Sequence, residues 1–421
     1  MSTALTSRAY AESLDAGDPL AGFRGRFAWP DDDRLIYLDG NSLGPLPTAT
    51  RDRIARVVAA EWGSALVRAW GEWIDLPHRA GDLIGAHLTG AAPGQVLVCD
   101  STTVNLFKLA SAALRARPGR GVIVTDDDNF PTDRYVLQGL AAQSGRELRV
   151  IRSDIDAGLD ERALSAALGA DVALVCLSHV AYRSGALADM ARITDLVHAA
   201  GALVLWDLCH SAGAVPVQLD ASGADLAVGC TYKYLNAGPG APAFLYVRRD
   251  LIDALPQPIW GWFGQADQFA MGPEYDPVPG IGRFATGTPP VLGIAAVEEG
   301  VKLLAAAGIS RLRDKGTALT GYLISLADEW LAPLGFELAS PRAGARRGCH
   351  VSLRHPEAWR LSQALIAAGV IGDYRTPDRL RLGPAPLYTR FTDVWDAMDR
   401  LRRIAAARSY EDLPAERSRV T

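Results

Sequence analysis

The stretch ALVLWDLCHSAGAVPVQLDASGADLAVGCTYKYL, residues 202–235, determines how the rest of the chain is interpreted. Its first apolar run, ALVLW, ends on Asp207, and its second, LAVGC, ends shortly before Lys233. Short apolar runs bounded by polar turns are typical of strands in a parallel sheet that is covered on both faces. Because ligands bind beyond the carboxyl ends of such strands, we expect Asp207 and Lys233 at a binding site.

A carboxylate and an amine at neighbouring strand ends are the pair that a pyridoxal 5'-phosphate (PLP) enzyme needs. The amine attaches the cofactor, and the acid keeps the pyridine nitrogen protonated so that the ring can accept electrons. For these two residues alone, the alternative is a helix-capping Asp207 and a solvated Lys233. The neighbouring motifs favour the PLP interpretation.

The strings WDLCHSAG (206–213) and TYKYLNAGPG (231–240) resemble the kynureninase family, PLP enzymes of fold type I in the class V aminotransferase group. The resemblance spans about residue 35 to about residue 400, because further matching strings follow in chain order: LDGNSLGP (38–45), TTVNLFK (102–108), NFPTD (129–133), GWFG (261–264) and APLYTRFTDVWDA (385–397). It implies an α/β fold with a mostly parallel central sheet in a large domain and a smaller C-terminal α+β domain.

The expected domain organisation follows from this resemblance and from the apolar periodicity. We predict an N-terminal arm over residues 1–45, a PLP-binding large domain over 46–290 and a small domain over 291–421. Apolar runs predict further strands at 96–99, 121–125, 171–177 and 243–247, and helical spacing predicts helices at 48–62, 188–200, 291–334 and 357–368.

Composition limits the partners and the compartment. The 421 residues suffice for two domains, and 49% hydrophobic with 22% charged residues is ordinary for a globular protein. A net charge of −5 gives no electrostatic footprint for nucleic acid, and no apolar stretch is long enough to span a membrane. Five scattered cysteines without CxxC or metal-ligand spacing, and no signal pattern, predict a cytoplasmic protein without a metal site.

Small hydroxyl residues at 101–103 open a predicted helix directly after a predicted strand. The free backbone N–H groups and the dipole of a helix N-terminus bind phosphate, so Thr102 and Thr103 are candidate phosphate ligands. An ordinary helix cap by Ser101 or Thr102 is the alternative. Asp207 and Lys233 downstream favour phosphate binding.

The loop at 129–133 holds further candidate cofactor ligands. Phe130 resembles the aromatic residue that stacks on the cofactor ring in the family, and a flat side chain suits a flat π-system. Asp133 resembles the family's second acidic residue near the cofactor, while Pro131 and Thr132 fix the turn between them.

Two other strand ends supply candidates. Ser178 follows a predicted strand and is placed to reach the cofactor, as is His179, although a histidine there is as often structural. His210 lies three residues past Asp207 and is a candidate to bind the phosphate or to orient the acid.

The segment 255–290 is rich in glycine, proline and aromatic residues and shows little periodicity, which is usual for a functional segment. In the family, the equivalents of Trp262 and Thr288 reach the cofactor phosphate of the neighbouring subunit. The resemblance therefore implies a homodimer with shared active sites.

The substrate residues are also implied by the resemblance. Arg381 in RLRLGP (379–384) matches the arginine that holds the substrate α-carboxylate, but spacing alone leaves Arg379 and Arg375 as rivals. Asn41 and Ser42 are expected at the mouth of the active site, with a plain connector as the alternative.

The resemblance implies hydrolysis of L-kynurenine, or its 3-hydroxy form, to an anthranilate and L-alanine, a step of tryptophan degradation. Lys233 moves the α-proton in this interpretation, and Tyr232 is a candidate for proton transfer or only for a hydrogen bond to the phosphate. The preference between the two substrates depends on residues near the aryl ring, such as Ser64 and Thr288, and is left open.

Three other functions fit the sequence less well. A class V cysteine desulfurase or aminotransferase shares the fold, but a desulfurase needs a reactive thiol, and Cys349 in RGCHVSL (347–353) is expected at the start of a buried strand. Desulfurases also usually stack a histidine where this chain has Phe130. A non-catalytic protein of this fold usually lacks the lysine, and a dinucleotide enzyme would need a GxGxxG turn.

Overall fold

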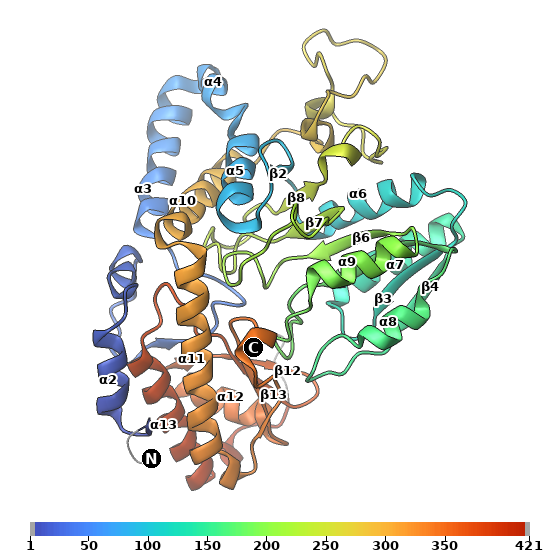
Figure 1. Cartoon of the computed structure of the whole chain (residues 1–421). Helices are drawn as coiled ribbons and strands as arrows, with labels where there is room; N and C mark the ends of the chain where they lie inside the picture. Colours follow the sequence, from blue (N-terminus) through green and yellow to red (C-terminus); the bar gives the residue numbers. More distant parts are fainter. Residues whose placement is uncertain (1–4, 417–421) are drawn as a thin grey trace.

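The computed structural model describes residues 5–416, which form a large and a small domain (Figure 1). The central sheet of the large domain is parallel except for β8, which runs antiparallel to both of its neighbours. Its strands lie in the order β2 (Val96–Val98), β8 (Phe244–Val247), β7 (Leu226–Gly229), β6 (Leu203–Asp207), β5 (Val172–Ser178), β3 (Val122–Asp126) and β4 (Glu147–Ile151). The predicted α/β fold with a mostly parallel sheet is therefore confirmed.

Both faces of this sheet are covered, as the apolar strand runs predict. Leu203 and Leu205 of β6 pack with α6 (Thr102–Arg115) and α7 (Pro131–Ser144) on one face. Val204 and Trp206 point to the opposite face, which is covered by α5 (Leu76–Ile84), α8 (Glu161–Ala167), α9 (Met190–Ala199) and α10 (Val291–Ala307). Alternate side chains of one strand thus enter two separate cores.

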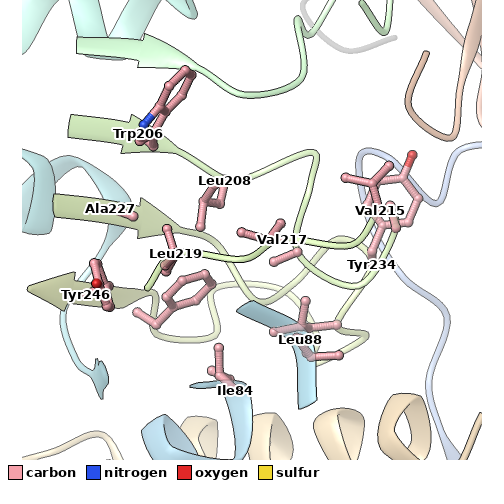
Figure 2. Packing of buried hydrophobic residues seen from close by; sticks show 14 of the residues in the cluster. Ile84, Leu88, Trp206, Leu208, Val215, Val217, Leu219, Ala227, Tyr234 and Tyr246 are labelled. Atoms are coloured by element: carbon pink, nitrogen blue, oxygen red, sulfur yellow. The ribbon is translucent and has the colours of Figure 1, made fainter. Parts of the chain in front are cut away.

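The connection from β6 to β7 contributes to the second core. Figure 2 shows Leu208, Val217 and Leu219 of this connection between the strand ends and the helical segment that carries Ile84 and Leu88. The backbone N–H of Leu219 donates to the carbonyl oxygen of Thr89 at 2.8 Å. This packing fixes the path of the chain immediately after Asp207.

The small domain has an antiparallel sheet with helices packed on it. Its strands lie in the order β12 (Asp373–Arg375), β13 (Arg379–Leu382), β10 (Val351–Arg354) and β9 (Glu337–Leu338). The helices are α11 (Ile309–Trp330), α12 (Ala358–Ala367) and α13 (Phe391–Ala407). A separate parallel pair joins β1 (Ile36–Tyr37) to β11 (Val370–Ile371), which brings the N-terminal segment to this domain.

The predicted N-terminal arm lies against the small domain. Its helix α2 (Arg8–Ala16) packs on α13, and the Asp15 carboxylate accepts from the Phe391 and Thr392 backbone N–H groups at 2.6 and 3.1 Å. Helix α10 packs with the large domain and α11 follows after Gly308. This packing favours a boundary near Gly308, although the division at 290/291 stays a prediction.

Three local features were not predicted. The helix expected over 48–62 consists of α3 (Thr48–Arg56) and a wider, π-helical continuation over Val57–Ala65. Strand β4 has charged and half-exposed residues because it is an edge strand, so it lacks an apolar run. Strand β12 has only three residues, two of them charged, and lies at the edge of the small-domain sheet. Within residues 5–416, no helix is long and apolar enough to cross a bilayer.

Helix α10 touches the segment after Lys233 at a glycine. A Cβ atom at Gly300 would lie 2.0 Å from the carbonyl oxygen of Leu235, far inside van der Waals contact. We therefore expect Gly300→Ala to displace α10 or the Lys233 segment and to lower the free energy of unfolding by about 1–3 kcal/mol. Urea unfolding followed by tryptophan fluorescence measures this change.

Gly321 on α11 is the matched control, because no atom lies within 4 Å of its Cβ position. Alanine there should be neutral or stabilise by up to about 1 kcal/mol through helix propensity. Equal effects of Gly300→Ala and Gly321→Ala would contradict the close approach.

Candidate active site

Lys233 lies buried beyond the carboxyl end of β7. Its Nζ is 3.4 Å from His210 Nε2, 5.7 Å from the ring centroid of Phe130 and 5.9 Å from that of Tyr232. Burial, followed by the charge of Lys233, lowers the pKa of His210 well below its usual value. The neutral imidazole can therefore accept a hydrogen bond from the lysine.

A pair of buried carboxyl groups lies at the same sheet edge. Asp207 ends β6, pairs in register with Ser178 of β5, and accepts a hydrogen bond from the Cys209 backbone N–H at 2.7 Å. Asp133, in the first turn of α7, packs against Asp207. Burial first, and then the negative charge of Asp207, raises the pKa of Asp133 well above its usual value. The Oδ2 atom of Asp133 has no hydrogen-bond partner within residues 5–416.

An aromatic side chain forms another wall of the site. Phe130 immediately precedes α7, is 37% exposed, and meets the Tyr182 ring edge-on at 5.3 Å between centroids. Asn129 fixes this loop, since its Oδ1 accepts from the Ser178 hydroxyl at 2.7 Å and from the Phe130 backbone N–H at 2.8 Å. Ser178 therefore supports the aromatic loop. Pro131 and Thr132 start α7 and set the turn between Phe130 and Asp133.

The N-terminus of α6, the predicted phosphate site, lies near these groups. Ser101 caps the helix by accepting from the Val104 backbone N–H at 3.3 Å, and the helix begins at Thr102. The Thr102 hydroxyl is 3.9 Å from Cys209 Sγ, two residues past Asp207. Thr103, in the same turn, is exposed, so its hydroxyl is available to a ligand.

Tyr232 and His179 have different surroundings. Burial, followed by the neighbouring thiols Cys230 and Cys209, raises the pKa of Tyr232, so the phenol stays protonated and can donate. The ring of His179 packs edge-on against Trp206 at 5.9 Å between centroids, and burial lowers its pKa to about 4. This packing into the second core indicates a structural role for His179.

These residues fit PLP. The cofactor needs an amine, a carboxylate partner for its ring nitrogen, an aromatic face and a phosphate site. Lys233, Asp207, Phe130 and the N-terminus of α6 offer these groups together. The unpartnered oxygen of Asp133 beside Asp207 suits a protonated ring nitrogen, because a buried pair of acids is stabilised by a neighbouring cation.

A second group of polar residues surrounds Arg381 at the domain junction. Its Nε donates to Asp373 Oδ1 at 2.8 Å, its Nη1 to the Tyr182 carbonyl oxygen at 2.6 Å and its Nη2 to Ser42 Oγ at 3.0 Å. Asn41 can turn its amide oxygen to accept from Nε and Nη2 at 3.0 Å each. The structure thus brings Asn41, Ser42 and Arg381 together.

The two rival arginines differ in their partners. Arg379 is buried and forms ion pairs with Asp156, at 2.7 Å, and with Asp378, which engage its guanidinium away from this group. Arg375 instead forms an ion pair with Asp373 at 2.7 Å and has a side chain that is 27% exposed. Arg375 and Arg381 therefore share one carboxylate.

Trp262 and Thr288 belong to the glycine- and proline-rich segment 255–290, which follows Lys233 in the sequence. Trp262 is 44% exposed and donates from Nε1 to the Gln268 carbonyl oxygen at 2.7 Å. Thr288 lines a cavity of about 850 Å³ with Asp100 and Thr286. Figure 1 shows part of the 255–290 segment as a loop that projects beyond the body of the large domain, whereas Ile281 and Phe284 of the same segment are buried in its core. The role of Trp262 and Thr288 toward a neighbouring subunit stays a prediction.

Sequence reasoning missed four residues of this region, namely Asn129, Tyr182, His350 and Asp373. The His350 ring lies 5.5 Å from that of His210 between centroids, and neither of its nitrogens has a hydrogen-bond partner within the described chain. The sequence DYR at 373–375 offered a signal for Asp373. An acid and an arginine in one short strand, with further arginines in the next, indicate a buried ion pair.

Comparisons with known proteins agree on one family. The class V aminotransferase family matches residues 36–351, and the kynureninase C-terminal domain family matches residues 312–401. The chain is 48% identical to the kynureninase of Pseudomonas fluorescens over 408 residues, which cover 95% of this chain and 96% of that protein. The kynureninase of Burkholderia pseudomallei strain 1106a is equally similar, at 48% identity with the same coverage.

Solved structures share the fold at low identity. A cysteine desulfurase from Thermococcus onnurineus NA1 superposes with a TM-score of 0.79 at 18% identity, covering 92% of this chain and 98% of that chain. A mutant of C-DES with glycine covalently linked to its PLP cofactor gives a TM-score of 0.78 at 18% identity, covering 90% and 98%. Identities this low show the fold alone.

The buried carboxyl pair generates a prediction about the cofactor-free protein. Folding raises the pKa of Asp133. The contribution of this group to the free energy of unfolding is therefore fully present below the unfolded pKa of about 3.9, and it is lost as the pH rises toward the folded pKa. Asp133→Asn removes this loss, so the cofactor-free variant should unfold at higher urea than wild type at neutral pH.

The advantage should disappear near pH 4, and each pKa unit corresponds to about 1.4 kcal/mol. Asp314→Asn is the control, an exposed acid on α11 outside the carboxyl pair that should leave the pH dependence of stability as in wild type. A cofactor-free Asp133→Asn protein that is less stable than wild type at every pH would contradict the unfavourable carboxyl pair.

Proposed function

Because the chain belongs to the kynureninase family, we propose that its site hydrolyses L-kynurenine, or 3-hydroxy-L-kynurenine, to anthranilate, or 3-hydroxyanthranilate, and L-alanine. The enzyme depends on PLP, as its family does. The observation that carries the proposal is the meeting of Lys233, Asp207 and Phe130 at one sheet edge, in a chain nearly half identical to kynureninases over its length.

Bound PLP supplies an electron sink for negative charge that develops on carbon atoms next to the substrate amino group. Lys233 would hold the cofactor through its amine and, once free, would carry the α-proton of the substrate. His210, neutral and 3.4 Å from Nζ, accepts a hydrogen bond and orients the lysine. Asp207 and Asp133 would hold a proton on the ring nitrogen of the bound cofactor.

Tyr232 and the threonines act near the phosphate. The Tyr232 phenol stays protonated because burial raises its pKa, so it can donate a hydrogen bond or a proton beside Lys233. The N-terminal turn of α6 holds the phosphate with Thr102 and Thr103. Phe130 stacks on the ring, and Ser178 holds the Phe130 loop through Asn129.

Arg381 orients the substrate. The Nε and Nη2 edge of Arg381 donates to Asp373, so the substrate carboxylate would be held by the remaining Nη1 N–H of Arg381 and by Arg375 while the substrate amino group reaches Lys233. Asn41 and Ser42 place hydrogen-bonding groups on the same guanidinium. Parallel rates on kynurenine and 3-hydroxykynurenine will identify the preferred substrate.

A desulfurase would need a mobile, reactive thiol. Cys349 is fully buried, its thiol lies 3.5 Å from the Pro384 carbonyl oxygen, and burial raises its pKa to about 12. Such a thiol is inert as a nucleophile. The likeness to desulfurases therefore extends to the fold, and Cys349 offers no support for their chemistry.

We also propose a homodimer with shared sites. A groove of about 380 Å³ is lined by Trp62, Trp70, Trp73, Pro289, Pro290 and Leu292, and Trp62 is 59% exposed. Aromatic residues are enriched in interface cores, so a second copy of the chain is the expected cover. Trp262 and Thr288 would then reach the phosphate of the neighbouring site. Five buried free thiols support a reducing, cytoplasmic location.

Lys233→Ala tests the covalent attachment. The variant should lose turnover and the cofactor adduct that borohydride traps, because Lys233 Nζ lies beside His210 and Phe130, whereas Lys108, the other buried amine at this sheet edge, is paired with Asp100 at 2.6 Å. Mass spectrometry of the trapped wild-type protein locates the adduct. Lys302→Ala, on the exposed face of α10, is the control and should retain both signals. An adduct on any other lysine would refute the assignment.

Mixed dimers test the shared site. A subunit with Lys233→Ala is combined with a subunit that carries Trp262→Ala, each being nearly inactive alone. Sharing places both lesions in one site and leaves the other intact, so statistical mixing should restore about a quarter of wild-type activity. Restored activity should appear only after subunit exchange. If the mixture is no more active than the two single variants, each subunit contains its complete site.

A further inference from the structure

Four ionisable side chains, two of them buried and two partly buried, lie together at the proposed substrate carboxylate site. Arg381 and Arg375 both contact Asp373, and Asp39 lies next to this group. Asp39 follows β1 and pairs as an isolated parallel bridge with Gly383, directly after β13. The fold therefore joins the N-terminal loop that carries Asn41 and Ser42 to the strand that carries Arg381.

Asp373 is committed to the arginines. Its carboxylate accepts from Arg381, from Arg375 at 2.7 Å and from the Ser42 hydroxyl at 2.8 Å. Burial opposes its ionisation, but the charge and hydrogen bonds of Arg381 outweigh burial and lower the pKa of Asp373 to about 2. Asp373 is therefore an anion at every working pH.

Asp39 has a different environment and is less buried than Asp373. Its Oδ1 atom is buried without a hydrogen-bond partner in the described part of the chain. Burial first, and then the negative charge of Asp373, raises the pKa of Asp39 to about 7, while Arg381 and the Ser42 hydroxyl act in the opposite direction. Arg375 also faces this carboxyl group.

The other groups that face Asp39 are phenols, and they are neutral. Burial is the largest cause that raises the pKa of Tyr37, Tyr234 and Tyr388 above the usual value. The charge of the cluster therefore changes only with Asp39 near neutral pH. With Asp39 protonated, two guanidinium groups and one carboxylate leave one net positive charge, and with Asp39 ionised the net charge is zero.

We propose that Asp39 is a positioning residue that carries a proton whenever the α-carboxylate of the substrate is bound at Arg381 and Arg375, so that substrate binding is linked to proton uptake. One net positive charge complements one carboxylate, whereas an ionised Asp39 would place a third carboxylate in a buried site with two arginines. Like charges at short range in low dielectric repel strongly. The inference rests on the proposed role of the Arg381 site.

The test uses the holoenzyme and the des-amino analogue of kynurenine, which keeps the aryl ketone and the carboxylate but cannot react with Lys233. Its carboxamide serves as a neutral control ligand. Calorimetry in two buffers of different ionisation enthalpy measures both the affinity and the number of protons taken up. This measurement needs no variant, so it stands even if Asp39 variants fold poorly.

Wild-type affinity for the acid should fall by up to about 30-fold between about pH 6 and about pH 8.5, with uptake approaching one proton per site at the upper end. The carboxamide should show neither effect. Asp39→Asn, a neutral isostere, should bind the acid with an affinity that does not fall over this pH range. Any titration of the Lys233–cofactor group would affect both proteins equally.

Binding of the acid without proton uptake above pH 7, or an identical fall in wild type and Asp39→Asn, would overturn the proposal. Failure of the proposed function is distinguishable, because the wild-type enzyme would then release no anthranilate from kynurenine at any pH. If the enzyme turns over kynurenine but binds the des-amino acid with the same affinity at every pH, only the proposed role of Asp39 is refuted.

Discussion

The ion pair between Asp373 and Arg381 is the interaction on which the arrangement of this protein depends most. Both side chains are almost completely buried, and removal of either partner would leave an uncompensated charge between the domains. The same guanidinium donates to the Tyr182 carbonyl oxygen of the large domain and to Ser42 of the N-terminal loop. One charged group therefore fixes three segments that are remote in sequence, and the proposed substrate site lies where they meet.

The opposite side of the site is built from groups that are unfavourable without a ligand. Asp133 and Asp207 are buried acids in contact, and His210 is a buried imidazole beside an amine. The surroundings of Asp133 and His210 shift the pKa of each group toward its neutral form. A site of this kind gives up stability in the empty protein so that the bound cofactor meets preorganised partners.

The fold and the chemistry differ in how far sequence determines them. The strands β5, β6 and β7 are fully apolar runs, so their existence and the position of Asp207 and Lys233 after two of them follow from pattern alone. Strands β4 and β12 could not be predicted in this way, because both are edge strands that carry charged residues. Their places are set by neighbours that lie far away in the chain.

By itself, the sequence determined the mostly parallel sheet, the family and the candidate residues at the strand ends. Hydrophobic periodicity and short motifs are local properties, and they can be recognised without knowledge of contacts. Only the tertiary structure decided which partners these residues meet: Arg379 faces Asp156, Arg375 and Arg381 share Asp373, and Ser178 supports the Phe130 loop. The hydrogen-bond partners and the burial of a side chain depend on distances between segments that are remote in sequence, and these distances exist only in the folded chain. The same distances set the pKa values of Asp39 and Asp133.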